Sequence, residues 1–187
     1  DMSSNYVDPL TTRYATKPML EQFSEKTRMI LWRKLWLALA ESEKQLGLNI
    51  TDEQLDQMRA HLEDINFEVA KEREKIVRHD VMAYVYAYGQ QCPKAMPIIH
   101  LGATSCYVTD NSDAIIYHGA LILVKNKLVN VMDKLAKFAL KYADMPTLGF
   151  THLQPAQLVT VGKRAALWLQ ELQMDYENLQ FVIDNTK

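Results

Sequence analysis

The chain has 187 residues, of which 48% are hydrophobic and 24% charged, with only 6 glycines and 6 prolines. This composition excludes a disordered chain and favours a compact, mainly helical protein. The formal net charge of −2 provides no attraction for nucleic acid or acidic membranes, so we expect neither as a partner. The most apolar stretch, residues 29–40, is too short to span a bilayer. Because the two cysteines lie in no CxxC arrangement, we expect a reducing, cytoplasmic compartment.

Residues 1–20 show no sustained hydrophobic period. They carry Pro9 and Pro18, which interrupt regular structure, so we predict an extended arm. This arm contains a polar cluster that includes Arg13 and Tyr14.

Helices are predicted after this arm. In residues 25–46 the apolar side chains recur at spacings of three and four, which predicts a helix that buries Trp36. Thr51 followed by Gln54 is a capping-box pattern, which predicts a second helix to about residue 62. Asn66 is a suitable cap for a third helix.

The apolar pattern returns in residues 77–88 and is then broken by Gly89 and Pro93. Residues 93–110 are the least periodic part of the chain and are rich in hydroxyl side chains. We therefore predict a junction here, with an N-terminal helical domain over residues 1–105 and a second domain over residues 106–187.

Two long hydrophobic repeats occupy the second domain. From Leu121 to Tyr142 and from Leu158 to Ile183 the spacings alternate between three and four, which is typical of long helices packed at a shallow angle. Two such helices alone would expose much apolar surface, so we expect a larger bundle, built from further chain or from partner subunits. No stop signal precedes Lys187, so we expect the chain to continue beyond it.

Polar residues that could carry chemistry gather between the apolar helices. Thr104 and Ser105 precede a helix predicted from about residue 112, where hydroxyls and helix-terminal N–H groups suit an anion such as a carboxylate. Helix capping by Asn111 or Ser112 explains the same pattern. The five histidines show no HxxxH or HxH spacing, so we expect no metal site, and His61 and His118 are interpreted as helix-surface residues.

Two histidines stand out. His79 lies between Arg78 and Asp80, which would shift its proton affinity in opposite directions, and the sequence leaves open which of them acts. His152 precedes Pro155, a residue tolerated in the first turn of a helix, so we expect its imidazole at a helix entrance. That position suits an acid catalyst, but it suits a capping or buried structural histidine as well.

The run GFTHLQPAQ at residues 149–157 resembles the THxQPAQ element of the fumarase and aspartase superfamily. Residues 78–83, RHDVMA, and 100–105, HLGATS, resemble the adenylosuccinate lyase family within it, as do residues 13–15, RYA. The resemblance runs through the whole chain and is closest to the animal-like type. It implies an all-α fold, in which an N-terminal helical domain is followed by the first long helices of a central bundle.

The resemblance also implies an activity. The family consists of lyases of purine nucleotide biosynthesis that cleave adenylosuccinate to AMP and fumarate, and that release fumarate from succinylaminoimidazole carboxamide ribotide. The reaction is an acid–base β-elimination that breaks a C–N bond, and no cofactor is implied. The partners implied are the small nucleotide substrate and identical subunits, since family members are homotetramers with active sites shared between subunits.

The roles implied by this resemblance fall on matching positions. His152 matches the acid, and the remaining matches bind substrate: Arg13 and Tyr14 the phosphate, Arg78, His79 and Asp80 other parts of it, and Thr104, Ser105 and Thr151 the succinyl carboxylates. The family's base is a serine in an SSxMPxKxNP-type loop, which these 187 residues do not contain. Two alternatives stay open: another fumarate-releasing lyase, such as one resembling argininosuccinate lyase, and a non-catalytic scaffold of the same fold.

Overall fold

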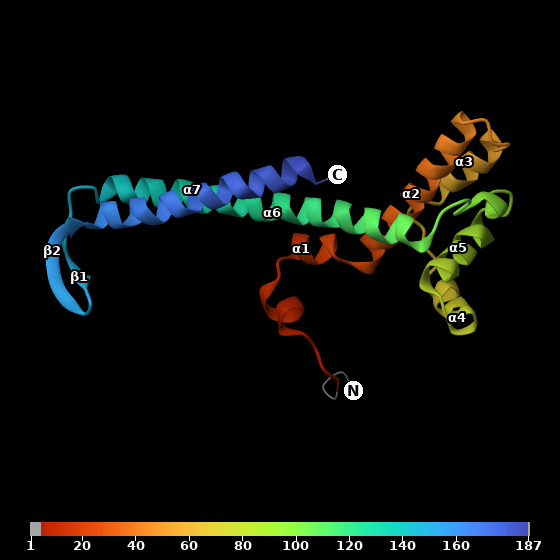
Figure 1. The fold of residues 1–187 in the computed structure, drawn as a ribbon. Coiled ribbons are helices and arrows are strands. Elements are labelled where there is room, and N and C mark those ends of the chain that lie inside the picture. Colours follow the sequence, from red (N-terminus) through yellow and green to blue (C-terminus); the bar gives the residue numbers. More distant parts are fainter. Residues whose placement is uncertain (1–4, 187) are drawn as a thin grey trace. The chain divides into compact units, whose positions relative to one another are not determined.

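The computed structural model describes residues 5–186 (Figure 1). Nearly all regular structure in this range is helical, with one two-stranded sheet, so the predicted all-α class is confirmed. The chain divides into two compact units, the first ending at Tyr117 and the second beginning at His118, and the two are described separately below. The boundary lies within one long helix, α6 (Ser105–Lys141). The predicted domain division at residue 105 stays a prediction.

Most of residues 10–22 are helical where an extended arm was predicted, and residues 1–4 of that arm lie outside the described residues. Residues Leu10–Tyr14 form the π-helix η2, and Lys17–Gln22 form α1. The Leu10 N–H donates to a carboxylate oxygen of Asp8 over 2.9 Å, so this aspartate stabilises the turn that follows it. Pro18 lies in the first turn of α1, where its missing N–H costs nothing. The prolines therefore begin these helices and do not prevent them.

The next three helices begin where the sequence predicts them. They are α2 (Glu25–Gln45), α3 (Asp52–Ala60) and α4 (Phe67–Val77). The Thr51 hydroxyl accepts from the Gln54 N–H, and the Gln54 side chain accepts from the Thr51 N–H, so the capping box is confirmed. Asn66 caps α4 by accepting from the Val69 N–H over 3.1 Å.

The region after α4 differs from its prediction in two places. Helix α5 (Asp80–Gln91) runs through Gly89, which was predicted to break it. A Cβ at Gly89 would lie 2.7 Å from the Met96 side chain, in the 3-10 helix η3 (Met96–Ile98), so this glycine permits close packing. Helix α6 begins at Ser105, about two turns earlier than predicted.

The core of the first unit surrounds Trp36, which is 1% exposed as the sequence predicts. Its ring meets Trp32 edge-on at 6.1 Å and lies 6.2 Å from the ring of Tyr88. The Tyr88 hydroxyl donates to the Met58 carbonyl over 2.7 Å, so its polar atom is satisfied inside the core.

A buried cation also belongs to this core. The Arg33 guanidinium lies 4.4 Å from the centre of the Tyr88 ring and donates to Gln91 Oε1 and to the His61 carbonyl. Burial lowers the pKa of Arg33, while Tyr88 and Asp64 beside it act in the opposite direction. His61 is therefore not the simple surface residue predicted: it ends α3, accepts from Arg33 and contacts Asp64 at 2.7 Å.

The two cysteines are both free and differ in environment. Cys106 is exposed on α6, whereas Cys92 is fully buried and its thiol donates to the Gln57 carbonyl over 3.3 Å. Burial raises the pKa of Cys92 to about 11, so the group remains a thiol at neutral pH.

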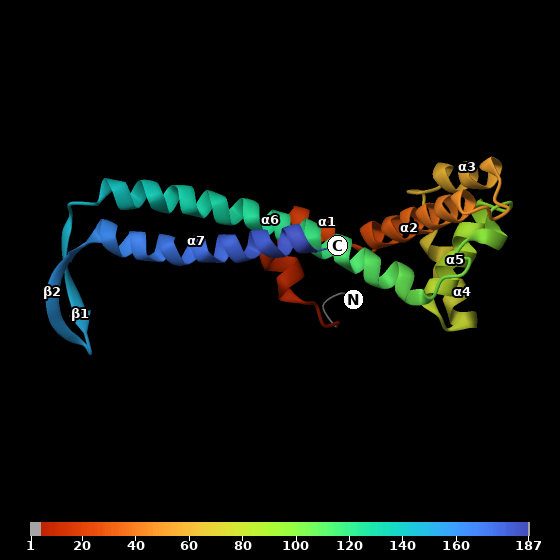
Figure 2. The ribbon, with the colours of Figure 1, turned by 45° about the horizontal axis from the view of Figure 1, so that its top comes forward.

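In the second unit, the rest of α6 and helix α7 (Val161–Asn185) run side by side in both views (Figures 1 and 2). They are joined by a hairpin of β1 (Pro146–Thr151) and β2 (Gln154–Thr160). The two long helices are confirmed, but the helix predicted at Pro155 is wrong, because residues 154–160 pair with β1. Pro155 is tolerated because a two-stranded sheet has only edge strands.

Close backbone contact joins α7 to the end of α6. The Gly162 N–H donates to the Tyr142 carbonyl over 2.8 Å, and the Val161 N–H donates to the Met145 carbonyl over 2.9 Å. A Cβ at Gly162 would collide with backbone atoms of Ala139 and Ala143. Glycine is thus required for this approach.

Apolar side chains remain exposed on the second unit. Phe138, Trp168 and Phe181 are 43%, 54% and 68% exposed, and a cavity of about 460 Å³ lies between α6 and α7 near Val129 and Leu169. A larger bundle would cover such surface, as the sequence predicts. No helix among the described residues is long and apolar enough to cross a membrane.

We predict that Gly162→Ala lowers the free energy of unfolding by about 1 to 3 kcal/mol, because backbone atoms must shift to accept the methyl group. The comparison is Gly89→Ala, where the methyl group meets side-chain atoms of Met96 and no backbone atom, and where alanine favours the helix by about 1 kcal/mol, so we expect a smaller loss. Denaturant unfolding of both variants measures the difference. Equal losses would contradict the assigned contact.

Candidate active site

The junction between α4 and α5 carries three of the predicted residues. Arg78 ends α4 in the left-handed conformation, with φ 52°, and its N–H donates to the Glu74 carbonyl. His79 is the N-cap of α5, where its Nδ1 accepts from the Met82 N–H over 3.4 Å. Asp80 is the first residue of α5, and its carboxylate accepts from the Val81 N–H over 2.8 Å. All three residues therefore lie at helix ends, which hold the side chains of His79 and Asp80.

The sequence left open whether Arg78 or Asp80 acts on His79. In the structure His79 Nδ1 faces Asp80, 3.7 Å from its Oδ1. In the neutral ring, the bond from the Met82 N–H requires Nδ1 to be the acceptor and leaves the proton on Nε2. The site therefore contains an imidazole N–H pointing away from α5.

This N–H meets the start of α6. His79 Nε2 lies 3.3 Å from Ser105 Oγ, a contact that joins two of the predicted stretches across 26 residues. Ser105 is the first residue of α6, where free N–H groups and the helix dipole favour an anion. The Thr104 carbonyl accepts from the Tyr107 N–H in the same turn.

The capping alternative for these hydroxyls is wrong, because α6 begins before the residues proposed as caps. Asn111 lies inside the helix, where its amide donates to the Tyr107 carbonyl over 2.7 Å. Ser112 is also internal, and its hydroxyl donates to the Thr109 carbonyl and accepts from Trp32 Nε1. Neither side chain caps α6, so Thr104 and Ser105 stand at its N-terminus.

His100 joins the same neighbourhood, a residue whose role the sequence did not predict. Its Nδ1 accepts from the Trp36 indole N–H over 2.9 Å, and the two rings meet edge-on. Burial, and then the nearby His79, lower the pKa of His100, so its ring is neutral at neutral pH. No sequence signal could reveal this, because the contact joins residues that are 64 positions apart.

Thr151 and His152 lie in the second unit, at the tip of the β1–β2 hairpin. Thr151 is paired with Gln154, and the two residues between them, His152 and Leu153, have φ values of 49° and 63°. Positive φ at both central positions defines a type I′ turn. The predicted helix entrance is therefore wrong: His152 is an exposed turn residue, eight positions before the N-cap Thr160.

Arg13 and Tyr14 lie in η2, and both are exposed. The Arg13 guanidinium lies 5.8 Å from the centre of the Tyr14 ring, and the contacts of the described residues do not join this pair to His79 or Ser105. The structure thus brings together the 78–80 and 104–105 stretches and describes the other candidates individually.

Backbone strain coincides with the candidate residues. Within residues 5–186, the non-glycine residues with positive φ are Arg78, His100, His152 and Leu153. Left-handed backbone costs a residue with a Cβ about 1 to 2 kcal/mol. All four belong to the stretches that carry the resemblance, so strain marks the same places independently.

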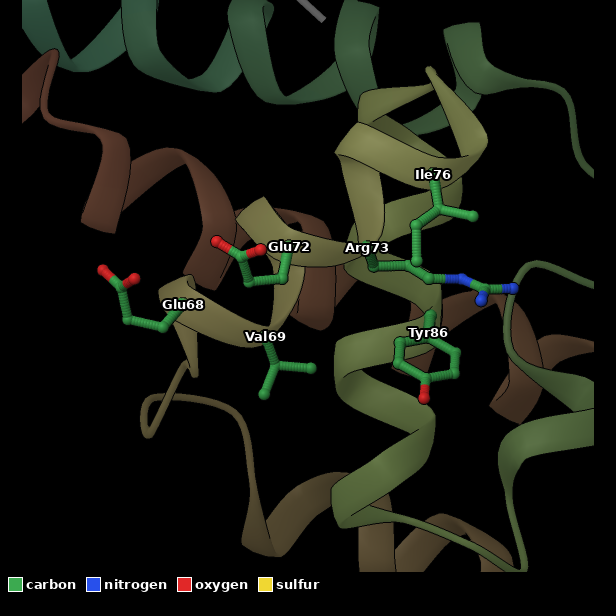
Figure 3. A pocket seen from close by; sticks show the side chains of 6 residues that line it. All are labelled: Glu68, Val69, Glu72, Arg73, Ile76 and Tyr86. Carbon is green, nitrogen blue, oxygen red and sulfur yellow. The ribbon is translucent and has the colours of Figure 1, made fainter.

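Two cavities of the first unit can be compared with these residues. Asp80 lines one of about 440 Å³, together with Glu25, Arg28 and Thr109. Another, of about 360 Å³, lies between α4 and α5 (Figure 3) and includes none of the predicted residues; the Arg73 guanidinium there lies over the Tyr86 ring at 4.4 Å. The first cavity is therefore the better candidate for a binding site, because a predicted site residue lines it.

The described residues contain no group of three or more His, Cys, Asp or Glu side chains that could hold a metal ion.

Comparison with known proteins supplies the family. The sequence profile of a family described as lyase matches residues 2–187. The chain belongs to this lyase family. It is 56% identical over 179 residues to adenylosuccinate lyase of Saccharomyces cerevisiae, covering 94% of this chain and 37% of that protein. It is 47% identical over 186 residues to adenylosuccinate lyase of Schistosoma mansoni, covering 100% of this chain and 39% of that protein.

Solved structures of the lyase superfamily share the fold. A 3-carboxy-cis,cis-muconate lactonizing enzyme from Pseudomonas putida matches with a TM-score of 0.82 and 28% identity, covering 92% of this chain and 41% of its own. A fumarate lyase from Mesorhizobium matches with a TM-score of 0.82 and 26% identity, covering 90% and 40%. This lyase chain therefore spans about two fifths of the length of the relatives it matches.

We predict that Arg78→Gly unfolds at a higher temperature than Arg78→Ala in this lyase, by an amount equivalent to about 1 kcal/mol. Both variants lose the guanidinium, but only glycine adopts φ 52° without strain. Thermal unfolding followed by circular dichroism measures the difference. If alanine proved equal or better, the left-handed conformation at residue 78 would be incorrect.

Proposed function

We propose that the full protein is an adenylosuccinate lyase that cleaves adenylosuccinate to AMP and fumarate. The observation that carries the proposal is 56% identity to such an enzyme over almost the whole chain. The contact of His79 with Ser105 supports it, since it joins two stretches that the family uses for substrate. By the same likeness the protein also releases fumarate from succinylaminoimidazole carboxamide ribotide, needs no cofactor, and works in the cytoplasm as a homotetramer.

The proposed reaction is an elimination. A base removes a proton from the carbon beside a succinyl carboxylate, and a carbanion-like intermediate forms. The C–N bond then breaks as His152 gives a proton to the leaving nitrogen, which yields fumarate and the free amine. The exposed turn leaves the imidazole accessible to a substrate, and an imidazole can act as a general acid.

Other residues are proposed to bind the substrate. The hydroxyl groups of Thr104, Ser105 and Thr151 would bind the succinyl carboxylates by donating hydrogen bonds to them, as would the free N–H groups at the start of α6. Arg78, His79 and Asp80 would contact other parts of the substrate, and Arg13 with Tyr14 would hold the phosphate. The base is proposed to be a serine of the full protein, in a signature loop that these 187 residues lack.

Two other functions must be separated from this one. The neighbours with known structure include enzymes with other names, a lactonizing enzyme and a fumarate lyase, so the fold does not choose the substrate. A lyase resembling argininosuccinate lyase would cleave argininosuccinate, and a scaffold of the same fold would cleave neither compound. Offering both substrates to the full-length protein, and following fumarate release, distinguishes the three; cleavage of argininosuccinate alone would overturn our proposal.

We predict that His152→Gln lowers turnover of adenylosuccinate at least about 100-fold, because the variant has no group to protonate the leaving nitrogen. The matched control is Leu153→Ala, in the same turn, where the side chain is 95% exposed. Turnover is measured from the loss of purine absorbance in the full-length protein. Undiminished turnover in His152→Gln would remove His152 from the role of acid.

A further inference from the structure

We propose that Trp36 is a positioning residue of the active site: its indole N–H holds the His100 ring in the form that carries its proton on Nε2 and presents that N–H to an oxygen atom of the substrate. This inference rests on the proposed lyase function, since it assigns His100 to the same site. It adds two residues that the resemblance leaves without a role.

The first step is the direction of the hydrogen bond. An indole nitrogen is a donor only, so the 2.9 Å contact between Trp36 Nε1 and His100 Nδ1 requires Nδ1 to accept. A neutral His100 ring must then carry its proton on Nε2. A doubly protonated ring would place two donors against each other, so the contact itself opposes the charged form.

The second step is the rigidity of the donor. Trp36 is 1% exposed and fixed by the rings of Trp32 and Tyr88, so its N–H cannot turn to water. Leaving a buried N–H without an acceptor costs about 1 to 3 kcal/mol. His100 is therefore the acceptor that this core needs, and the same bond determines how the imidazole is oriented.

The third step is the position of His100 Nε2. Among residues 5–186 the His100 side chain has one hydrogen bond, the one from Trp36, so none of these residues is an acceptor for its Nε2–H. The ring is half-buried and lies near enough to His79 to be affected by its charge. His79 in turn contacts Ser105. The free N–H thus belongs to the neighbourhood where the proposed substrate binds.

The backbone gives independent support. His100 has a φ of 65°, a conformation that costs about 1 to 2 kcal/mol for a residue with a Cβ. A surface loop without a task would gain stability from glycine or asparagine there. The strain is tolerated while it delivers an imidazole to the Trp36 N–H on one side and leaves an N–H free on the other.

The first test uses amides that imitate each ring nitrogen, in the full-length protein. His100→Gln can place an N–H donor near the Nε2 position, whereas His100→Asn can accept from Trp36 but reaches no further. We expect kcat/KM for adenylosuccinate to be about tenfold higher in His100→Gln than in His100→Asn, because one hydrogen bond is worth about that factor. Asparagine adopts left-handed backbone more readily than glutamine. If the role of His100 were purely structural, His100→Asn would be the more stable variant and His100→Gln would not be the more active one. Equal activities, or the reverse order, would overturn the inference.

The second test asks whether Trp36 acts through His100. We expect Trp36→Phe to lower kcat/KM about tenfold in the native background and less than about twofold in the His100→Gln background, because glutamine needs no orienting donor. The same factor in both backgrounds would contradict a positioning role. Trp32→Phe is the matched control. Trp32 lies one turn before Trp36 on α2, and its indole N–H donates to Ser112 Oγ instead of to His100.

The third test needs no substrate. With ¹⁵N-labelled histidine, the His100 signal, identified by its loss in His100→Gln, should show the Nε2–H form in the native protein and in Trp32→Phe, and a mixture of both forms in Trp36→Phe. A native ring protonated on Nδ1 would overturn the inference even if adenylosuccinate is cleaved. Conversely, the expected signal in a protein that does not cleave adenylosuccinate would overturn the proposed function and leave the Trp36–His100 assignment intact.

Discussion

The first unit is organised by the need of one buried indole N–H for an acceptor. Trp36 fills the centre of the core, where its ring is packed by other aromatic side chains, and its only polar atom must find a partner there. His100 supplies it from the segment between η3 and α6. The packing of the core and the orientation of a candidate site residue are thus the same interaction.

Helix ends explain why the other candidate residues of the first unit occur where they do. Arg78 ends α4, His79 caps α5, Asp80 begins α5 and Ser105 begins α6. The N-terminal ends of helices leave backbone N–H groups free to bind an anion, and side chains at either end are released from the regular surface of a helix. A small all-helical unit can therefore build a polar site by bringing its helix ends together, and the contact from His79 to Ser105 does this.

The parts that were predictable from the sequence are those decided by local chemistry. The capping box of Thr51 and Gln54, and the cap at Asn66, fix helix starts through bonds three residues apart, and both were found. The hairpin was missed because it depends on pairing two segments, and Pro155 taken alone suits a helix start equally well. The resemblance identified His152 as a candidate even though its local structure had been misjudged.

Other misses have the same cause. Gly89 looked like a helix breaker because the Met96 side chain that fills its open face is not visible in the local pattern. The helices η2 and α1 depend on Asp8 and on the permissive position of Pro18, two effects that outweigh the general tendency of proline to interrupt helices. His100 had no assigned role, since its partner Trp36 is distant in sequence.

The buried thiol of Cys92 has a practical consequence for studying this protein. Since it is sealed in the core and held as a thiol, it can react with a soluble reagent only when the surrounding helices separate. The exposed Cys106 on α6 reacts without such opening, so its labelling rate measures the intrinsic reactivity of the reagent. Cys92 thus reports local opening of the core, and Cys106 serves as its internal reference. The ratio of the two labelling rates measures how often the core around Trp36 opens.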